Sequence, residues 1–330
     1  MIGTQRSGSN LLRVMLNELP ELYAPHPPHV IQVFAPLVKY YGNLAVPENF
    51  KRLIDHVCTL IELNPVSWET GRLNRDLIFT RCRRNTLLEI FIQINEMVCE
   101  ARNKTVWCCK SLETVYYIEH FQQEDFHPFV IYLYRDGRDV AASFKKVMIG
   151  EKHIYHLARK WKLEQELALR YVAGLPQNKF ISLRYEDFIL NPEYFIRQIC
   201  EKAGLQYADA AMEYYKSDES KRTAESGKMW QNVTKPVAKD NTRKFLTELS
   251  AAELELFEFI AGDELDKLGY ERAVTDFSFD AITEERIKAF DEENKQLKKA
   301  ALEGADANDK LKRKPQADFM EKLKADLESR

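Results

Sequence analysis

The sequence predicts an α/β fold: a single domain with a central parallel sheet flanked by helices, a helical insertion and a helical C-terminal tail. Three short runs rich in β-branched and aromatic residues support this prediction, at residues 105–109, 129–134 and 180–185. Each run is followed by polar or helical sequence. Strands that alternate with helices indicate a parallel sheet, because parallel strands need a crossover connection that is usually a helix.

The first element is a glycine-containing loop that leads into a helix. Residues 3–9 read GTQRSGS, and apolar residues then recur at helical spacing as far as Leu19. Only Met1 and Ile2 precede this loop, whereas loops of this type normally leave the end of a buried strand. We therefore expect the native chain to begin upstream of Met1.

The remaining elements divide the chain into a domain and a tail. The domain spans residues 1–275, and apolar residues at helical spacing predict that residues 35–104 form a helical insertion. Residues 280–330 form a charged extension rich in Lys, Glu, Asp and Ala. We expect two amphipathic helices there, broken at residues 304–309 and at Pro315 and resting on the domain or on a partner, with partial disorder as the alternative.

Composition excludes several classes of protein. The 330 residues include 48 Lys and Arg against 51 Asp and Glu, a net charge of −3, which argues against a nucleic-acid-binding protein. The sequence has no apolar run long enough to span a membrane and no signal peptide, so we expect a cytoplasmic protein. The six cysteines lack CxxC spacing, which argues against a zinc site and a disulfide framework.

The opening loop has the features of an anion site. The start of a helix presents unpaired N–H groups and the positive end of the helix dipole, and Gly3 and Gly8 allow close approach of the backbone. The spacing fits GxxxxG, but Ser9 and Asn10 replace the Lys and Ser/Thr of a nucleoside triphosphatase loop. Arg6 supplies a cation within the loop, which suits a phosphosulfate bound without metal. An ordinary turn that caps a helix is the alternative.

A second motif makes the anion site more specific. Residues 130–144 read VIYLYRDGRDVAASF, a strand that ends at Arg135, a turn, and a helix that carries Ser143. Together with GTQRSGSNLL, this motif resembles the sulfotransferases that use 3′-phosphoadenosine-5′-phosphosulfate (PAPS). The resemblance covers about residues 2–270 and implies the family's fold, which is related to P-loop NTPases. The family commonly has proline at the position of Gly137.

The resemblance assigns two groups of donor-binding residues. The 5′-phosphosulfate would be bound by Arg6, Ser7, Gly8, Ser9 and Asn10, and the 3′-phosphate by Arg135 and Ser143. Arg138 either assists or pairs with an acid. Tyr185 would lie near the adenosine, and a late segment with Trp230, Lys235, Lys239 and Lys244 resembles the loop that covers the donor.

Sulfuryl transfer also needs a base and positive charge at the sulfur. Arg6 is the natural electrostatic stabiliser, and Lys110 resembles the family's lysine beside the sulfuryl group. The histidine that follows this lysine in cytosolic sulfotransferases is replaced by Leu112. The segment PHPPH at residues 25–29 is similar in position to the base of tyrosylprotein and polyketide-associated sulfotransferases, which favours His29, with His26 as the second choice and Glu113 as a weaker alternative.

The sequence leaves the acceptor open. A carbohydrate or small-metabolite hydroxyl is favoured by the family alone, and the helical insertion is expected to shape the pocket for it. A P-loop kinase-like phosphotransferase and a non-catalytic nucleotide-binding or assembly module are the alternatives. In the second alternative, the charged C-terminal helices would mediate association, including self-association.

Overall fold

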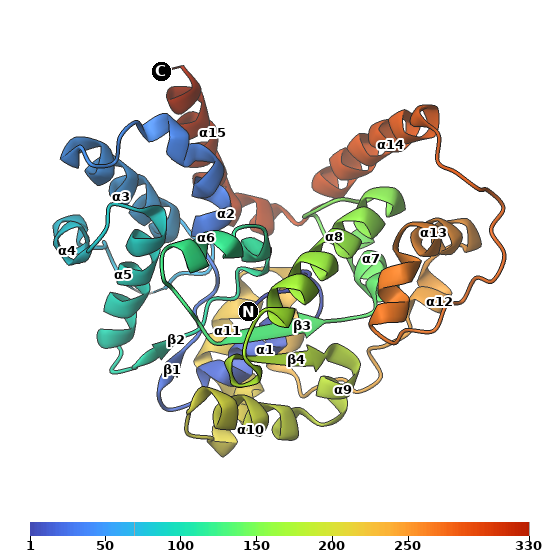
Figure 1. Ribbon diagram of the computed structural model, residues 1–330, viewed down its shortest axis with the longest axis horizontal. Helices are drawn as coiled ribbons and strands as arrows, with labels where there is room; N and C mark the ends of the chain where they lie inside the picture. Colours follow the sequence, from blue (N-terminus) through green and yellow to red (C-terminus); the bar gives the residue numbers. More distant parts are fainter. Residues whose placement is uncertain (69, 330) are drawn as a thin grey trace.

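Two pairs of parallel strands lie at the centre of the protein (Figure 1). The computed structural model describes residues 1–68 and 70–329. Strand β1 (Leu22–Tyr23) pairs with β2 (Val106–Trp107), and β3 (Val130–Tyr134) pairs with β4 (Phe180–Arg184). Strands β2, β3 and β4 fall within the three predicted runs, so the prediction of a mixed α/β fold with parallel strands is confirmed.

The first two residues lie between the strand pairs. The Ile2 N–H donates to the Ile131 carbonyl at 2.9 Å, and the Leu133 N–H donates to the Ile2 carbonyl at 3.0 Å. The Met1 amino group donates to the carbonyl of Cys109, just beyond β2, at 2.8 Å. This segment forms only an isolated bridge, so the described residues contain two two-stranded sheets, and the single central sheet is not confirmed.

Helices make up most of the remaining structure. The first third of the chain contains α1 (Ser9–Asn17), α2 (Val30–Phe34), the 3-10 helix η1 (Ala35–Tyr41), α3 (Pro47–Glu62), α4 (Arg75–Arg81) and α5 (Leu87–Glu100). The middle contains η2 (Leu112–Tyr116), α6 (Ile118–Gln123), α7 (Gly137–Lys145), α8 (Ile154–Ala173), η3 (Gln177–Lys179), α9 (Tyr185–Leu190) and α10 (Pro192–Ala203). The last third contains η4 (Asp209–Lys216), α11 (Asp218–Glu225), η5 (Lys228–Thr234), α12 (Phe245–Glu248), α13 (Ala251–Lys267), α14 (Glu284–Glu303) and α15 (Ala307–Glu328).

The helices of residues 35–104 share a hydrophobic core with the end of the chain. Phe50 and Ile54 of α3 are fully buried, as their helical spacing predicts. Leu323 and Leu327 of α15 belong to the same cluster and are 4% and 2% exposed. Helix α15 therefore packs against α3 and η1, and its later turns lead away from α14 (Figure 1). The predicted pair of C-terminal helices is present and rests on the domain.

One expectation for the tail is wrong, because Pro315 lies inside α15 and does not break it. Proline lacks an N–H, so the carbonyl four residues earlier loses its helical partner. That residue, Leu311, has an exposed side chain, which places this turn of the helix at the surface, where water can satisfy the carbonyl. Helix α14 docks through Asn294, whose Oδ1 accepts from the N–H groups of Lys152 at 2.9 Å and His153 at 3.0 Å.

A buried ion pair fixes α1 to α11. The guanidinium of Arg13 is fully buried and pairs with Glu219, and its nitrogens also donate to the Ala24 carbonyl at 2.9 Å and to Thr223 Oγ1 at 2.5 Å. Breaking a buried pair leaves an uncompensated charge away from water. This pair therefore holds the helix that carries the opening loop against the C-terminal half of the domain.

We predict that Glu219→Gln lowers the free energy of unfolding by about 3 kcal/mol, because Arg13 would keep its buried charge and lose its counterion. Urea denaturation measures this change. Glu213→Gln is the matched control, since Glu213 pairs with Lys216 and both side chains are more than half exposed. The control should change stability by less than about 1 kcal/mol. Equal losses in the two variants would contradict a structural role for the Arg13 pair.

Candidate active site

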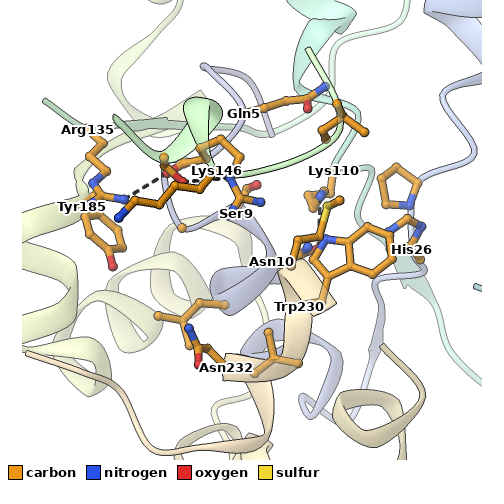
Figure 2. Close-up of a pocket in the computed structure, with 18 of the residues that line it drawn as sticks. Gln5, Ser9, Asn10, His26, Lys110, Arg135, Lys146, Tyr185, Trp230 and Asn232 are labelled. Carbon is orange, nitrogen blue, oxygen red and sulfur yellow. Dashed lines mark hydrogen bonds between the residues drawn. The ribbon is translucent and has the colours of Figure 1, made fainter. Parts of the chain in front are cut away.

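A cavity of about 400 Å³ lies where the carboxyl ends of three strands meet the start of α1. Lys110, Arg135 and Tyr185 line it and follow β2, β3 and β4, respectively. This edge is the usual ligand crevice of parallel α/β proteins. The structure brings most of the predicted site residues together here (Figure 2). Those that line the cavity are Arg6, Gly8, Ser9, Asn10, His26, His29, Lys110, Arg135, Ser143, Tyr185, Trp230 and Lys244.

Two glycines determine the path of the opening loop. Gly3 has φ +130°, and a Cβ there would collide with the Leu133 carbonyl. Gly8 has φ +85° immediately before α1, and a Cβ would lie 2.5 Å from the Tyr185 ring. Both positions therefore require glycine for conformation and for space. The loop lies against β3 and α9, and the N-terminus of α1 faces the cavity.

Two guanidinium groups lie close together in this cavity. Arg6 has φ 72°, unusual for a residue with a side chain, and its carbonyl accepts a hydrogen bond from Arg135 Nη1 at 3.2 Å. Arg6 Nε donates to Ser143 Oγ at 3.1 Å. Burial and the neighbouring Arg135 lower the pKa of Arg6 to about 10. The arrangement concentrates positive charge, and the side-chain partner of Arg6 is a neutral hydroxyl. The charge of Arg6 is therefore available to a bound anion.

Asp139 connects Arg135 to a distant loop. Arg135 Nη2 donates to Asp139 Oδ2 at 3.2 Å and to the Asn241 carbonyl at 2.9 Å. The same carboxylate accepts the N–H groups of Arg243 at 2.9 Å and Phe245 at 3.0 Å. The loop before α12 is therefore held over the cavity by one buried carboxylate, and this loop supplies Lys244 to the cavity wall.

Tyr185 forms a flat apolar wall beside Arg135. The guanidinium centre of Arg135 lies 4.5 Å from the centre of the Tyr185 ring, within the range of a cation–π contact. Asn241 Nδ2 donates to the Tyr185 hydroxyl oxygen at 2.6 Å. Burial raises the pKa of Tyr185, so its hydroxyl stays protonated at neutral pH. Figure 2 shows Tyr185 and Arg135 together at one end of the cavity.

Lys110 lies toward the other end, beside α1. Its Nζ donates to Asn10 Oδ1 at 3.0 Å. Burial, followed by the positive charges of Arg13 and Arg6, lowers the pKa of Lys110 to about 7. Lys110 is therefore a lysine whose charge depends on what occupies the cavity, because a bound anion would favour its protonated form.

His29 is held in a defined orientation. It has φ 60° and directly precedes α2, and its Nδ1 lies 3.1 Å from Gln32 Oε1. An amide oxygen only accepts hydrogen bonds, so Nδ1 carries the hydrogen and Nε2 keeps the lone pair. Burial, followed by the charge of Lys110, lowers the pKa of His29 to about 4. His29 is therefore neutral at physiological pH, and its Nε2 is able to accept a proton.

His26 has a different environment. Its backbone carbonyl accepts hydrogen bonds from Asn64 Nδ2 at 3.2 Å and Trp68 Nε1 at 2.6 Å, which fixes the main chain. Its ring lies 4.7 Å from the Trp230 ring, and both ring nitrogens are buried with no hydrogen-bond partner among the described residues. Burial lowers the pKa of His26 well below the usual value. Both candidate histidines therefore line the cavity, but only His29 has an oriented ring.

Other predicted residues lie outside the cavity lining. Glu113 pairs with Lys160 at 2.5 Å and accepts from Gln5 Nε2 at 3.3 Å, so its carboxylate is already engaged. Arg138 pairs with Asp136 at 2.7 Å and with Glu258, which decides between its two predicted roles in favour of pairing with acids. The remaining residues outside the lining are Ser7, which is fully buried, Lys235 and Lys239.

Several residues of the lining were not predicted from the sequence. Lys146 follows Ser143 by three positions, and this helical spacing places both on one face. The spacing is visible in the sequence, so Lys146 could have been predicted from it. Gln5 lies within the opening loop itself. Asn241 comes from the loop held by Asp139, and Arg313 and Gln316 come from α15. No local pattern marks these last three, because only the fold brings them to the cavity.

The described part of the chain offers neither a metal site nor a membrane span. Among the side chains that the structure describes, no group of three or more His, Cys, Asp or Glu is placed to hold a metal ion. No helix within residues 1–68 and 70–329 combines the length and apolar character needed to cross a membrane.

Comparisons with known proteins identify the family. A family model described as the sulfotransferase family matches residues 1–209, and the chain therefore belongs to this family. The sulfotransferase domain from the Synechococcus PCC 7002 olefin synthase has a similar fold, with a TM-score of 0.52 and 19% identity over 79% of this chain and 92% of that one. The sulfotransferase domain from the curacin biosynthetic pathway gives 0.53 and 17%, over 82% and 96%. No curated protein sequence matches the chain.

We predict that Asp139→Asn loosens the loop before α12, because an amide would present N–H donors to backbone N–H groups that now meet a carboxylate. Hydrogen exchange at the Arg243 and Phe245 amides should become faster, and the free energy of unfolding should fall by about 2 kcal/mol. Asp240→Asn, an exposed change in the same loop, should alter neither. Unchanged exchange at both amides in the Asp139 variant would show that this carboxylate does not hold the loop.

Proposed function

We propose that the protein transfers the sulfuryl group of PAPS to an acceptor hydroxyl. The observation that carries this proposal is the close approach of two cations at the start of α1: Arg135 donates to the Arg6 backbone carbonyl, and its charge helps to lower the pKa of the partly buried Arg6. Such a site favours a ligand with several negative charges. Ser9 and Asn10 stand where a nucleoside triphosphatase loop has Lys and Ser/Thr, which favours PAPS over ATP with magnesium.

The two ends of the cavity suit the two ends of the donor. Arg135 and Ser143, with Lys146 beside them, would bind the 3′-phosphate, and Tyr185 would pack near the adenosine. The backbone at Gly8, Ser9 and Asn10 would bind the 5′-phosphosulfate, together with Arg6. Lys244 would cover the donor from the loop that Asp139 holds. The side chain of Ser7 is fully buried outside the cavity lining, so we propose that Ser7 contacts the donor through its backbone.

The P-loop-related fold also belongs to this proposal. The hydrogen bonds of Met1 to Cys109 and of Ile2 to β3 support a single parallel sheet in the order β1, β2, the first residues, β3 and β4. In this arrangement the opening loop leaves a central strand position, as phosphate-binding loops normally do. The site then lies where the carboxyl ends of the central strands meet.

The reaction we propose uses His29 as the base. His29 Nε2 would take the proton of the acceptor hydroxyl while the acceptor oxygen forms a bond to sulfur. The bond between sulfur and the bridging oxygen of the 5′-phosphate breaks at the same time. The products are a sulfate ester and 3′,5′-adenosine bisphosphate. Arg6 and Lys110 would stabilise the negative charge on the oxygens around the transferring sulfur.

The acceptor class, the cellular location and self-association form the rest of the proposal. Asn64 and Pro65 are the lining residues from the helical insertion, and a small metabolite or carbohydrate hydroxyl remains our proposed acceptor class. We propose a cytoplasmic location. The exposed Leu297, Leu302 and Leu311 on α14 and α15 support self-association through these helices as a further proposal.

The donor proposal predicts selective stabilisation by 3′,5′-adenosine bisphosphate. At a concentration one hundred times its Kd, this ligand should add about 2.7 kcal/mol to the free energy of unfolding, while ATP with magnesium adds less. Arg135→Gln should remove most of the effect. Thermal melting in the presence of each ligand measures it. Stabilisation by ATP with magnesium alone would overturn the proposal.

The base assignment predicts that His29→Ala lowers the rate of sulfate transfer by about a hundredfold or more, since general bases contribute roughly 10²–10⁴. The affinity for 3′,5′-adenosine bisphosphate should stay nearly unchanged, because His29 does not bind the donor. Labelled PAPS with a panel of hydroxyl acceptors measures the rate. His26→Ala is the comparison. If His26→Ala lowers the transfer rate by this factor while His29→Ala stays active, the base is His26 and not His29.

A further inference from the structure

The last helix of the chain forms part of the cavity wall. Arg313 and Gln316 of α15 line the cavity, although both lie outside residues 1–209, which the family model matches. Gln316 Nε2 donates to the Leu60 carbonyl of α3 at 3.0 Å, and the buried Leu323 and Leu327 fix the following turns. The position of α15 is therefore set by packing, and Arg313 is held at the cavity.

Arg313 has polar atoms without partners. Its Nε and Nη2 are buried and make no hydrogen bond with any described residue. Its guanidinium centre lies 5.1 Å from the centre of the Trp230 ring. Burial lowers the pKa of Arg313, and Asp309, one turn earlier, opposes this effect. The Asp309 carboxylate also accepts a hydrogen bond at Oδ2 from the backbone N–H of Lys228, at 3.3 Å.

The same indole also contacts His26, whose two ring nitrogens are buried and unpartnered. Figure 2 shows Trp230 and His26 beside Lys110 and Asn10, away from Arg135 and Tyr185. Arg313 therefore lies at the end of the cavity that the donor's adenosine does not use in the proposed function. Buried donors without partners are rare in folded proteins and indicate a bound ligand or water.

The cavity has no carboxylate to spare for Arg313. Among the described residues, Asp139 and Glu248 are the acids of the lining. Asp139 is engaged by Arg135, and Glu248 pairs with Lys146 at 2.5 Å. Lys110 is assigned to the transferring sulfuryl group. Asp309, outside this lining, attracts Arg313, but the buried Nε and Nη2 of Arg313 have no hydrogen-bond acceptor among the described residues and are available to a ligand.

We propose that the acceptor alcohol carries an anionic group, a carboxylate or a phosphate, which binds Arg313 beside Trp230. This inference rests on the proposed sulfotransferase function. A guanidinium matches the geometry of both anions with two parallel hydrogen bonds, and the indole supplies an apolar surface for the carbon chain of the acceptor. The C-terminal helix then determines acceptor specificity, while Arg6, Arg135 and the other donor residues of the opening loop and α7 lie within the family match.

The test uses paired probes that differ in charge. The carboxylate pair is 3-hydroxyoctanoate and its methyl ester, and the phosphate pair is glycerol 3-phosphate and glycerol. Each probe is added to protein saturated with 3′,5′-adenosine bisphosphate, and binding is measured by thermal stabilisation. Transfer from labelled PAPS to each probe is then measured. One anionic probe should bind about tenfold or more tightly than its neutral partner, as expected for a charge-assisted hydrogen bond.

Three variants separate recognition from folding. Arg313→Gln should reduce the preference for the anionic probe to about twofold or less, and Arg313→Lys should keep part of it, because the charge remains but the fork is lost. Lys314→Gln is the matched control, since Lys314 is exposed on the same helix and pairs with Asp318 at 2.8 Å. Affinity for 3′,5′-adenosine bisphosphate should be the same in all three variants.

The outcomes distinguish the two proposals. Equal binding of charged and neutral probes by the wild type, including no binding of either, overturns the inference about Arg313. So does an Arg313→Gln variant that retains the full preference. A wild type that 3′,5′-adenosine bisphosphate does not stabilise contradicts the proposed function instead. The carboxylate and phosphate pairs show which anion the site prefers.

Discussion

The interaction on which the site depends is the close approach of two cations that repel each other, the buried Arg135 and the partly buried Arg6. The chain offsets this repulsion with neutral or shared acceptors, namely the Arg6 carbonyl, the Ser143 hydroxyl and Asp139. Burial of charge with incomplete pairing costs free energy, and an anion that enters the cavity would offset that cost. The low pKa values of Arg6, Lys110 and His29 share this origin, because burial is the largest cause of each and a neighbouring cation adds to it.

Features that are local in the sequence could be predicted well. The opening loop, and the strand and helix around Arg135 and Ser143, each depend on residues within one short segment. Glycine spacing, hydrophobic period and helix ends are all encoded there. The family resemblance then placed Lys110 and the histidine segment near the loop, and the structure brings both to the cavity. Their chemical roles stay predictions.

Features that depend on tertiary contacts could not be predicted. Strand β1 has two residues, Leu22 and Tyr23, too few for a periodic pattern, and it forms only because β2 pairs with it. Asn241 reaches Tyr185 because Asp139 binds the following backbone N–H groups. Arg313 resembles every other cation of a highly charged helix, and only the burial of Leu323 and Leu327 turns it toward the cavity. Asn241 and Arg313 therefore belong to the site only through long-range packing, which cannot be read from a single sequence.

The pKa values of Lys110 and His29 also bear on the proposed reaction. A neutral Lys110 would stabilise the transferring sulfur poorly, and a His29 with a pKa of about 4 would be a weak base. Negative charge from the donor would raise the pKa of both groups, because it opposes the effect of the neighbouring cations. Lys110 would then be protonated, and His29 would become a stronger base while staying oriented by Gln32. In the proposed reaction, donor binding therefore favours proton transfer, since the charge of the donor raises the pKa of both residues.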